Sequence, residues 1–347
     1  MKRPTMLDIA NRAGVSKGAV SFALNGRPGV SEPTRRRILA IAEQLGWQPN
    51  SAAVALSDGR AGAFGLVIDR PAKTLGLEPF FMNLVSGIQS ELSLDGTPLL
   101  FTVAEDQQAE IAIYRSWWAR RRVDGVFLVD LRQDDPRVPV LEDLGMPTVV
   151  VGGPGGSGSL PAVWSDDREA VRTALLHLVE LGHRRIGRIS GPDPLLHTRI
   201  RGTAFDQMTA EYGVLGRTVA TDYSGEQGAA ATRRLLRPDR PDGGLPPTAL
   251  LYDNDVMAVS GLTAVQALGL RVPQDVSLIA WDDSPLCELV SPSLTALSRD
   301  IAGYGARAAQ LLRKSSGGAT VGDLEDPASR LQTRSSTGPA PRTESRD

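Results

Sequence analysis

Apolar positions in the first fifty residues recur at helical spacing, in three short stretches that turn residues separate. The pattern predicts one helix over residues 6–13 and a second over residues 17–24, joined at Gly14, which adopts a positive φ without a side-chain clash. Ser16 is placed to cap the second helix, and Ser31 is placed to cap a third. Two short helices around such a turn, braced by a third, predict a helix-turn-helix.

From residue 61 onward, apolar strand-like runs alternate with amphipathic helical stretches. The predicted strands are residues 63–68, 99–103, 125–129, 148–151, 185–190, 249–252 and 276–281. This alternation favours parallel sheets covered by helices on both faces, in two lobes of about 100 residues each. The glycine- and serine-rich run 152–161 is predicted to cross between the lobes, residues 315–327 to form a loop, and the chain from Gly338 to form a loose tail.

Composition adds a charge asymmetry to this pattern. The chain has 347 residues, 41% hydrophobic and 22% charged, which is enough for two or three domains with buried cores. The formal net charge is −2, yet the first 60 residues hold nine basic and four acidic residues, against 29 and 36 in the remainder. A basic head before an acidic body is typical of a module that meets phosphate, although a solvated helical surface carries the same charge.

The sequence favours a binding protein without membrane anchor over an enzyme. No apolar run approaches the roughly 18 residues that span a bilayer, and the amino terminus lacks the apolar core of a secretory signal, so a cytoplasmic location is expected. A single cysteine, Cys287, and three histidines give little material for a disulfide or a metal centre. None of the motifs G-x-S-x-G, H-E-x-x-H or G-x-x-x-x-G-K occurs. We therefore expect no catalysis, no metal and no cofactor.

The start of the second predicted helix carries side chains suited to reading DNA. A helix fits the major groove, and residues near its start reach base edges. Lys17, Gly18 and Ser21 form this start: Lys17 can donate to guanine or to phosphate, and Gly18 lets the backbone come close. Phe22, one turn on, can contact a thymine methyl group or pack within the module. Contacts to phosphate, which set register, are predicted for Thr5, Ser16, Asn25, Ser31 and Arg35.

A short helical stretch follows the head, where Pro49 and Asn50 precede a run of helix formers that ends at Asp58-Gly59. An isolated helix this short is marginal in water, because nucleation costs more than one or two turns return. A second copy on DNA would supply a packing partner, with Ala53 keeping the contact close and Leu56 as an apolar wedge into the minor groove. A plain linker helix is the alternative.

The run DIANRAGVSKGAVSFALNGRPGVSEPTRRRILAIAEQLGWQPNSAAVAL resembles the DNA-binding head and hinge of the LacI/GalR family of bacterial transcription regulators. The resemblance implies a homodimer on a pseudo-palindromic, double-stranded DNA operator, with Leu56 opening a central base step. It places Lys17, Gly18 and Phe22 at base-reading positions and adds Asn50 and Ala53 to the DNA-binding set. Phe22 stands where many members carry arginine, which leaves the operator sequence open.

The resemblance continues over the body, through EPFFMNLVSGI, RRRVDGVFLV, HTRIRGTAF, LLYDNDVMAVSGL and RVPQDVSLIAWDD. It implies a body similar to periplasmic sugar-binding proteins, with a ligand cleft between lobes. The implied effector-binding residues are Phe81, Asp130, Arg199, Tyr223, Asn254 and Asp282. An ordinary core position is the alternative for Phe81, and a surface ion pair for Arg199. Ala204 replaces the usual glycine, and Gly152 stands where some sugar-responsive members are acidic, so the effector stays open.

These observations give the chain a predicted organisation. Residues 1–49 form an all-α helix-turn-helix domain, 50–60 the hinge, 61–338 a two-lobed α/β domain for effector binding and dimerisation, and 339–347 a flexible tail. The predicted function is that of a homodimeric repressor of carbohydrate-related genes, which a small sugar-like effector releases from its operator. An activator, a corepressor-dependent regulator, or a regulator with a non-sugar ligand is the alternative.

Overall fold

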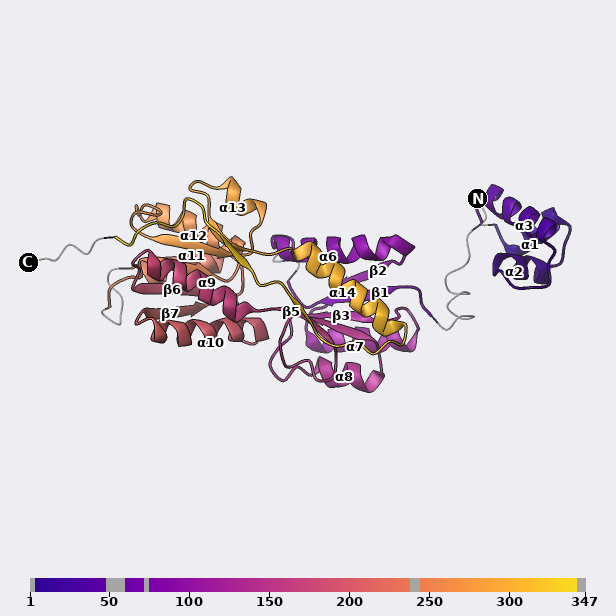
Figure 1. The fold of residues 1–347 in the computed structure, drawn as a ribbon, viewed down its shortest axis with the longest axis horizontal. Coiled ribbons are helices and arrows are strands. Elements are labelled where there is room, and N and C mark those ends of the chain that lie inside the picture. Colours follow the sequence, from indigo (N-terminus) through magenta and orange to yellow (C-terminus); the bar gives the residue numbers. More distant parts are fainter. Residues whose placement is uncertain (1–3, 48–59, 72–74, 238–243, 342–347) are drawn as a thin grey trace, which may run out of the picture. The chain divides into compact units, whose positions relative to one another are not determined.

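The computed structural model describes residues 4–47, 60–71, 75–237 and 244–341 (Figure 1). The chain divides into two compact units, one up to Ala61 and one from Gly62 onward. Nearly all of the predicted hinge, with Asn50, Ala53 and Leu56, lies outside the described residues.

The first unit contains the three predicted helices α1 (Met6–Ala13), α2 (Lys17–Leu24) and α3 (Glu32–Gln44). Thr5 caps α1 reciprocally with Asp8, and Ser16 Oγ accepts from the backbone N–H of Ala19 at 3.2 Å to cap α2. Gly14 adopts a φ of 65°, as the turn between the helices requires. One side chain from each helix is fully buried, and together Ile9, Val20 and Ile38 form the centre of the head's core.

The first lobe of the body is a parallel sheet with the strand order β11-β5-β4-β3-β1-β2. Its strands are β1 (Phe64–Ile68), β2 (Leu99–Val103), β3 (Val126–Val129), β4 (Thr148–Val151), β5 (Ala162–Ser165) and β11 (Leu324–Asp326). Alternate side chains of β1 and β3 enter two cores. One core packs under α6 (Pro79–Leu92) and α14 (Ile301–Ser316), and the other packs under α7 (Gln107–Ala119) and α8 (Arg137–Leu144). A short 3-10 helix, Ser93–Asp95, directly follows α6.

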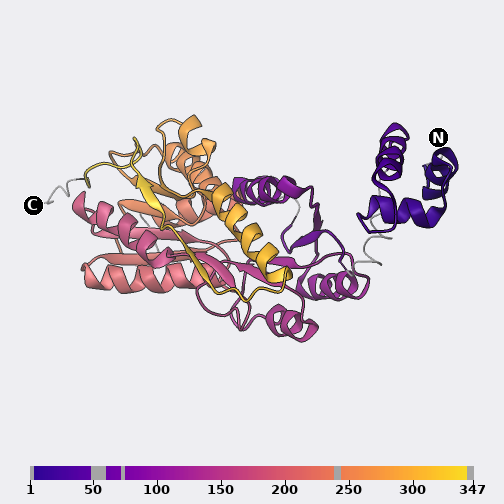
Figure 2. The same cartoon turned by 45° about the vertical axis from the view of Figure 1, so that its right-hand side comes forward.

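Helices α6 and α14 come from opposite ends of the body and lie side by side in both views (Figures 1 and 2). Glycines allow this close packing. A Cβ atom on Gly87 of α6 would overlap the carbonyl oxygen of Ala302, and one on Gly305 of α14 would overlap that of Leu84. The end of the chain thus completes the first lobe.

The second lobe is a sheet with the order β12-β10-β9-β8-β6-β7, parallel except where β12 meets β10. Its strands are β6 (Arg185–Ser190), β7 (Leu215–Ala220), β8 (Ala249–Tyr252), β9 (Ser277–Trp281), β10 (Thr295–Ser298) and β12 (Arg330–Gln332). Helices α9 (Asp167–Glu180) and α10 (Leu196–Glu211) share a core on one side of the sheet, and α11 (Gly225–Leu236), α12 (Asp255–Ala267) and α13 (Pro285–Leu289) surround a second core on the other. The two predicted α/β lobes are therefore present.

The chain crosses between the lobes after β5, after β10 and after β11. The run 152–161 does not cross: it joins β4 to β5 within the first sheet, so its predicted role was wrong. Its glycines turn the chain back to a neighbouring strand, with Gly152 and Gly153 at positive φ. The loop predicted over 315–327 also needs correction, because α14 extends to Ser316 and β11 falls within it.

The predicted loose tail is anchored where the structure describes it. The carbonyl oxygen of Gly338 accepts from the buried ring of His183 at 3.1 Å, and its N–H donates to Ser277 Oγ at 3.1 Å. The N–H of Ala340 donates to the carbonyl of Leu181 at 2.8 Å. The prediction was therefore wrong through residue 340, and residues 342–347 lie outside the described chain.

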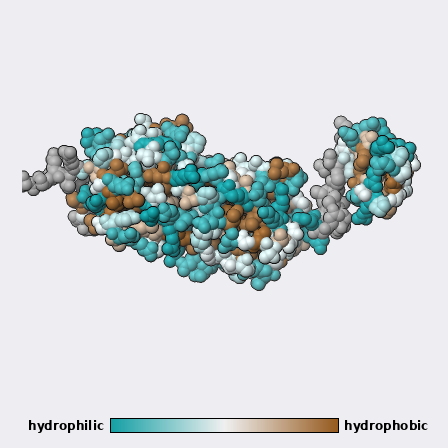
Figure 3. Space-filling model, in the orientation of Figure 1, coloured by the Kyte–Doolittle hydropathy of each residue, from teal (hydrophilic) through white to brown (hydrophobic). Residues whose placement is uncertain are grey.

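The surface mixes hydrophilic side chains with scattered apolar patches (Figure 3). Within the described residues, no helix has the length and apolar character that a membrane crossing needs.

Candidate functional site

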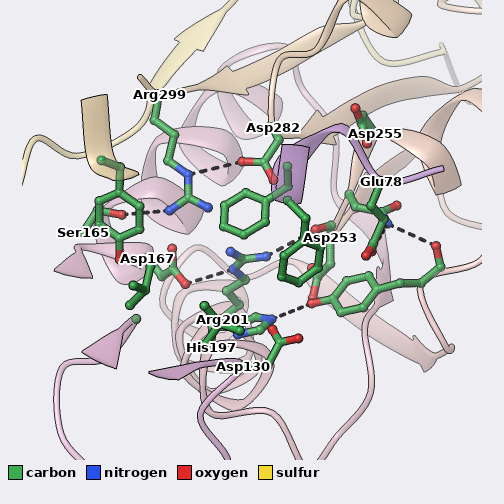
Figure 4. Close-up of a pocket in the computed structure, with 18 of the residues that line it drawn as sticks. Glu78, Asp130, Ser165, Asp167, His197, Arg201, Asp253, Asp255, Asp282 and Arg299 are labelled. Carbon is green, nitrogen blue, oxygen red and sulfur yellow. Dashed lines mark hydrogen bonds and ion pairs between the residues drawn. The ribbon is translucent and has the colours of Figure 1, made fainter. Parts of the chain in front are cut away.

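A pocket lies where the two lobes meet, outside the carboxyl ends of the parallel strands (Figure 4). Asp130 directly follows β3 and Gly152 follows β4 in the first lobe. Asp253 follows β8 and Asp282 follows β9 in the second. Since parallel strands place their carboxyl ends at one edge, the two sheets bring polar side chains from distant parts of the sequence to the same space.

Three arginines line this pocket, and each is bonded to a carboxylate of its own. The Nε atom of Arg70 donates to Asp130 at 2.7 Å. In the second lobe, Arg201 Nε donates to Asp167 at 3.0 Å. Arg299, at the second crossover, donates from Nε to Asp282 and from Nη1 to Ser165 Oγ, both at 3.3 Å. Arg299 therefore joins the sheet of the second lobe to that of the first.

Aromatic rings orient these guanidinium groups. The guanidinium carbon of Arg201 lies 3.7 Å from the ring centre of Trp281, and that of Arg70 lies 4.8 Å from the ring of Tyr223 and 5.7 Å from that of Phe81. Burial alone would raise the pKa of Asp130, but the charge and hydrogen bond of Arg70 outweigh burial and lower it. Asp130 is therefore an anion, and the Arg70–Asp130 pair is a fixed acceptor and donor in the pocket wall.

Asn254 makes a direct contact between the lobes. Its Oδ1 accepts from the backbone N–H of Met257 at 2.8 Å and caps α12. Its Nδ2 donates to the backbone oxygen of Tyr223 at 3.1 Å and to Glu78 Oε1 at 3.3 Å. Because Glu78 precedes α6 of the first lobe, this amide ties the lobes together at the pocket.

Two carboxylic acids of the pocket have raised pKa values. Burial raises the pKa of Glu78 to about 7, against the lowering effect of Arg70. Burial also raises the pKa of Asp255 to about 6, although the neighbouring hydroxyl of Ser284 lowers it. Glu78 Oε2 and Asp255 Oδ2 are buried without a hydrogen-bond partner among the described residues. Both groups therefore retain acceptor capacity that the protein does not use.

The backbone is held in the left-handed region at three pocket residues that are not glycine. The φ angles are 51° at Asp130, 70° at Tyr223 and 63° at Asp282. Such conformations cost energy and persist where surrounding contacts impose them. At Asp130 the contact is visible, since Nη2 of the buried Arg137 donates to its carbonyl oxygen at 2.9 Å.

His197 contributes a neutral ring to the pocket. Burial lowers its pKa to about 3, and the charge of Arg201 acts in the same direction. Its Nε2 lies 2.8 Å from the hydroxyl of Tyr223, whose ring stacks on the imidazole. The pair therefore supplies a hydroxyl and a neutral imidazole rather than a further positive charge beside the three arginines.

The structure brings five of the six predicted effector residues to this pocket, namely Phe81, Asp130, Tyr223, Asn254 and Asp282. Arg199 was the wrong arginine. It is exposed on α10, whereas Arg201, two residues on, is buried in the pocket wall. Residues two apart on a helix point to nearly opposite sides, so only one of the pair can face the pocket.

Several pocket residues were not predicted. Besides Arg201, the missed charged or polar residues are Arg70, Glu78, Ser165, Asp167, His197, Asp253, Asp255, Arg299 and Tyr304. The positions of Arg70 and Asp255 gave a signal, because each comes within three residues after a predicted strand, at the edge where such sheets bind ligands. Glu78, His197 and Arg299 depend on how the crossovers and helix starts meet, which no strand pattern encodes.

In the head, the start of α2 is open to solvent. Lys17 and Gly18 are exposed, and Phe22 is 42% exposed, so its ring reaches the surface of the helix. Ser21 is half-buried and accepts a hydrogen bond from Asn25 Nδ2 at 3.4 Å. Thr5 and Ser16 are engaged as helix caps. The DNA-binding roles of these residues stay predictions.

Arg35 and Ser31 have local partners that the sequence did not reveal. The guanidinium of Arg35 donates to the carbonyl oxygens of Ala23 at 3.0 Å and Arg27 at 2.6 Å, so it holds the loop after α2. Ser31 stands at the N-cap position of α3 but bonds the hydroxyl of Thr34 at 2.9 Å and no backbone N–H of the helix, so its predicted capping bond is absent.

Comparisons with known proteins cover both units. Residues 5–50 match the family "Bacterial regulatory proteins, lacI family", and residues 175–337 match "Periplasmic binding protein-like domain". The HTH-type transcriptional regulator CelR of Thermobifida fusca is 32% identical over 326 residues, which cover 90% of this chain and 91% of that protein.

Two solved structures extend the comparison to the fold. The transcriptional regulator CelR–cellobiose complex is 30% identical and covers 96% of this chain and 100% of its own, with a TM-score of 0.71. The Lac repressor dimer bound to operator and the anti-inducer ONPF is 24% identical and covers 97% and 100%, with a TM-score of 0.85. At that identity the second likeness shows the fold alone.

Proposed function

Because the chain belongs to the LacI family of bacterial regulatory proteins, we propose that it is a homodimeric repressor of carbohydrate-related genes, controlled by a small sugar. It is a DNA-binding transcription regulator with an effector-binding body. Two heads related by twofold symmetry would read the half-sites of a pseudo-palindromic operator in the cytoplasm. The Lac repressor, which shares the fold, is a dimer on its operator, and this supports the proposed assembly.

The pocket between the lobes is the observation that carries the sugar proposal. Carboxylates, guanidinium groups and an amide from both lobes converge on it, and they suit the hydroxyl groups of a sugar. The buried rings of Phe81 and Tyr223 line the same pocket and add apolar surface beside the polar groups. The related CelR forms a complex with cellobiose, which favours the same ligand class for this chain.

The lobes connect ligand binding to the head. A sugar held by groups of both lobes stabilises one relative position of the lobes, and the hinge that follows the head responds to that position. The sugar acts only through its different affinities for the two states, so it releases the operator if the DNA-free state binds it better. A corepressor-dependent regulator would use the same pocket, but its DNA-bound state would bind the ligand better than its DNA-free state. An activator would also use this pocket.

The test is a thermal-shift screen of the full chain against mono- and disaccharides, followed by operator titration. The operator is first selected from a random duplex library. We expect a sugar that stabilises the protein to weaken operator binding. Stronger operator binding with that sugar would establish the corepressor alternative, and stabilisation only by non-sugar ligands would remove the carbohydrate proposal.

A further inference from the structure

Two carboxylates of the pocket, Glu78 and Asp255, have no arginine within hydrogen-bond distance among the described residues. Arg70, Arg201 and Arg299 each bond an aspartate, as described above. Asp253 also has a partner, the buried Arg188, whose Nε donates to it at 2.9 Å. Glu78 lies 4.0 Å from Arg70 Nη1, which is beyond hydrogen-bond distance. No ion pair is found for Asp255 among the described residues.

These two carboxylates belong to different lobes and meet at one part of the pocket. Glu78 lies just before α6 in the first lobe, and Asp255 begins α12 in the second. Asn254, the neighbour of Asp255, bonds Glu78 directly, and Figure 4 shows the two acids on the same side of the pocket. The charge of Asp255 is among the causes that raise the pKa of Glu78, which also places the two groups near each other.

Both side chains are buried with one oxygen unsatisfied. Glu78 is 7% exposed and Asp255 is 3% exposed, and the oxygens without a partner are Glu78 Oε2 and Asp255 Oδ2. A buried acceptor without a donor is unfavourable, so these atoms need a hydrogen from outside the protein or a proton of their own. The groups that face them are Arg70 and Asp130 near Glu78, and Ser284 and Asp282 near Asp255. None of the four supplies a hydrogen bond to the two unsatisfied oxygens.

We propose that Glu78 and Asp255 are specificity-determining residues, which accept hydrogens from hydroxyl or ammonium groups of the effector across the lobe junction. Their negative charge repels sugars that carry a phosphate or a carboxylate. No pocket arginine can compensate for this repulsion, because each already has a carboxylate partner. The effector is therefore a neutral sugar or an amino sugar. This inference rests on the proposed function of the same pocket and narrows its ligand class.

The experiment compares neutral, amino and acidic sugars on the full chain. Glucose, cellobiose and glucosamine are titrated beside glucose 6-phosphate and glucuronic acid, with thermal shift and calorimetry as readouts. We expect binding within the first group alone. Glu78→Gln and Asp255→Asn remove acceptor oxygens with little change in shape, and each should weaken binding of the sugar at least tenfold.

A second readout separates ligand recognition from a structural role. Without ligand at pH 8, the same two variants should raise the Tm, because they remove a buried negative charge with one oxygen that has no hydrogen-bond partner. Residues that only hold the fold together would lower it. Glu211→Gln and Asp143→Asn, at exposed positions on α10 and α8, are the matched controls and should change neither affinity nor Tm.

The outcomes distinguish this inference from the proposed function. If a neutral sugar binds and neither variant weakens it, or if glucose 6-phosphate or glucuronic acid binds more tightly, the specificity role is wrong while sugar control stands. A lower Tm of both variants in the absence of ligand also overturns it. If no sugar of either group binds at millimolar concentration, both the proposal of a sugar effector and the proposed role of Glu78 and Asp255 in binding it are rejected.

Discussion

At the scale of single residues, the pocket is built from charges that are neutralised locally. Arg70, Arg201 and Arg299 are held by both a carboxylate and an aromatic face. Such pairs cost desolvation energy when they are buried, so their net stabilisation is small, but removal of one partner leaves a buried charge unpaired. Their main effect is to fix donors and acceptors at defined positions, as ligand recognition requires.

Substitution of Arg201 tests this arrangement most directly. Arg201→Lys keeps the charge but loses the flat stack on Trp281 and the Nε bond to Asp167. We expect it to weaken sugar binding at least tenfold and to lower stability by about 1–3 kcal/mol. Calorimetric titration and urea unfolding measure both. Arg199→Lys, two residues away and exposed, is the control, and an equal effect at both positions would contradict the assignment of Arg201.

The raised pKa of Glu78 predicts a pH dependence of stability. Its pKa is about 7 in the folded protein and near 4.5 in the unfolded chain, so between these values the folded state holds more protons. Stability contributed by the protonated form is therefore lost as the pH rises from about 4.5 to 7. His197, whose pKa is lowered to about 3, acts in the opposite direction.

The difference between Glu78→Gln and the unchanged chain isolates this contribution. Their unfolding free energies should coincide below about pH 4.5, diverge between pH 4.5 and 7, and stay apart above pH 7, with the variant more stable by a margin on the order of a few kcal/mol. Urea unfolding across that range is the measurement. Parallel profiles at all pH values would show that Glu78 is not protonated preferentially in the folded state.

At the scale of elements, the sequence was most informative where burial is continuous. Four of the seven predicted strands have the observed bounds, and the other three begin one residue later, as at Phe64. The strands that were missed are short or lie at sheet edges, and β7 alternates exposed and half-buried positions without a continuous apolar run. The glycine-rich run 152–161 shows the same limit, since a flexible composition allows a turn but does not say which strands it joins.

The predicted pocket shows a similar division. Residues directly after strands, such as Asp130 and Asp282, could be placed because topology sends strand ends to one edge. Arg201 could not, because the choice between two arginines on α10 depends on the rotation of that helix against the sheet. Arg299 could not either, since it lies on a crossover whose path the sequence did not reveal.

Arg35 illustrates how an element can depend on a residue predicted for another role. Its guanidinium holds the loop between α2 and α3 through the carbonyls of Ala23 and Arg27. Arg35→Ala should destabilise the head by about 1–3 kcal/mol and speed amide exchange in residues 25–30. Arg36→Ala removes the same charge at an exposed position of α3 and should leave exchange unchanged. Equal amide exchange in both variants would show that the hydrogen bonds of Arg35 do not stabilise the loop after α2.

At the scale of the whole molecule, two units share one chain but not one core. The head has three helices in its described residues and its own core, and the body from Gly62 onward contains the pocket with both lobes. The body is closed by its own last elements, since α14 returns to the first lobe and β12 to the second. The proposed effector binding therefore needs only the body, whereas the proposed regulation needs the body and the head on one chain.

Regulation of this kind has to be reciprocal. If a sugar weakens operator binding by a given factor, the operator weakens sugar binding by the same factor, because both bias one equilibrium between states. We expect a factor of about 5–150, measured by titrating the full chain with sugar in the presence and absence of operator duplex.

A chain that begins at Gly62 should bind the sugar with the affinity of the DNA-free protein, and added duplex should not change it. Lys17→Ala, which is expected to weaken operator binding by about 1–3 kcal/mol, should leave the coupling factor intact once the operator is saturating. A sugar affinity that is the same with and without operator would mean that the pocket and the head act independently, and a control by sugar would then have to be abandoned.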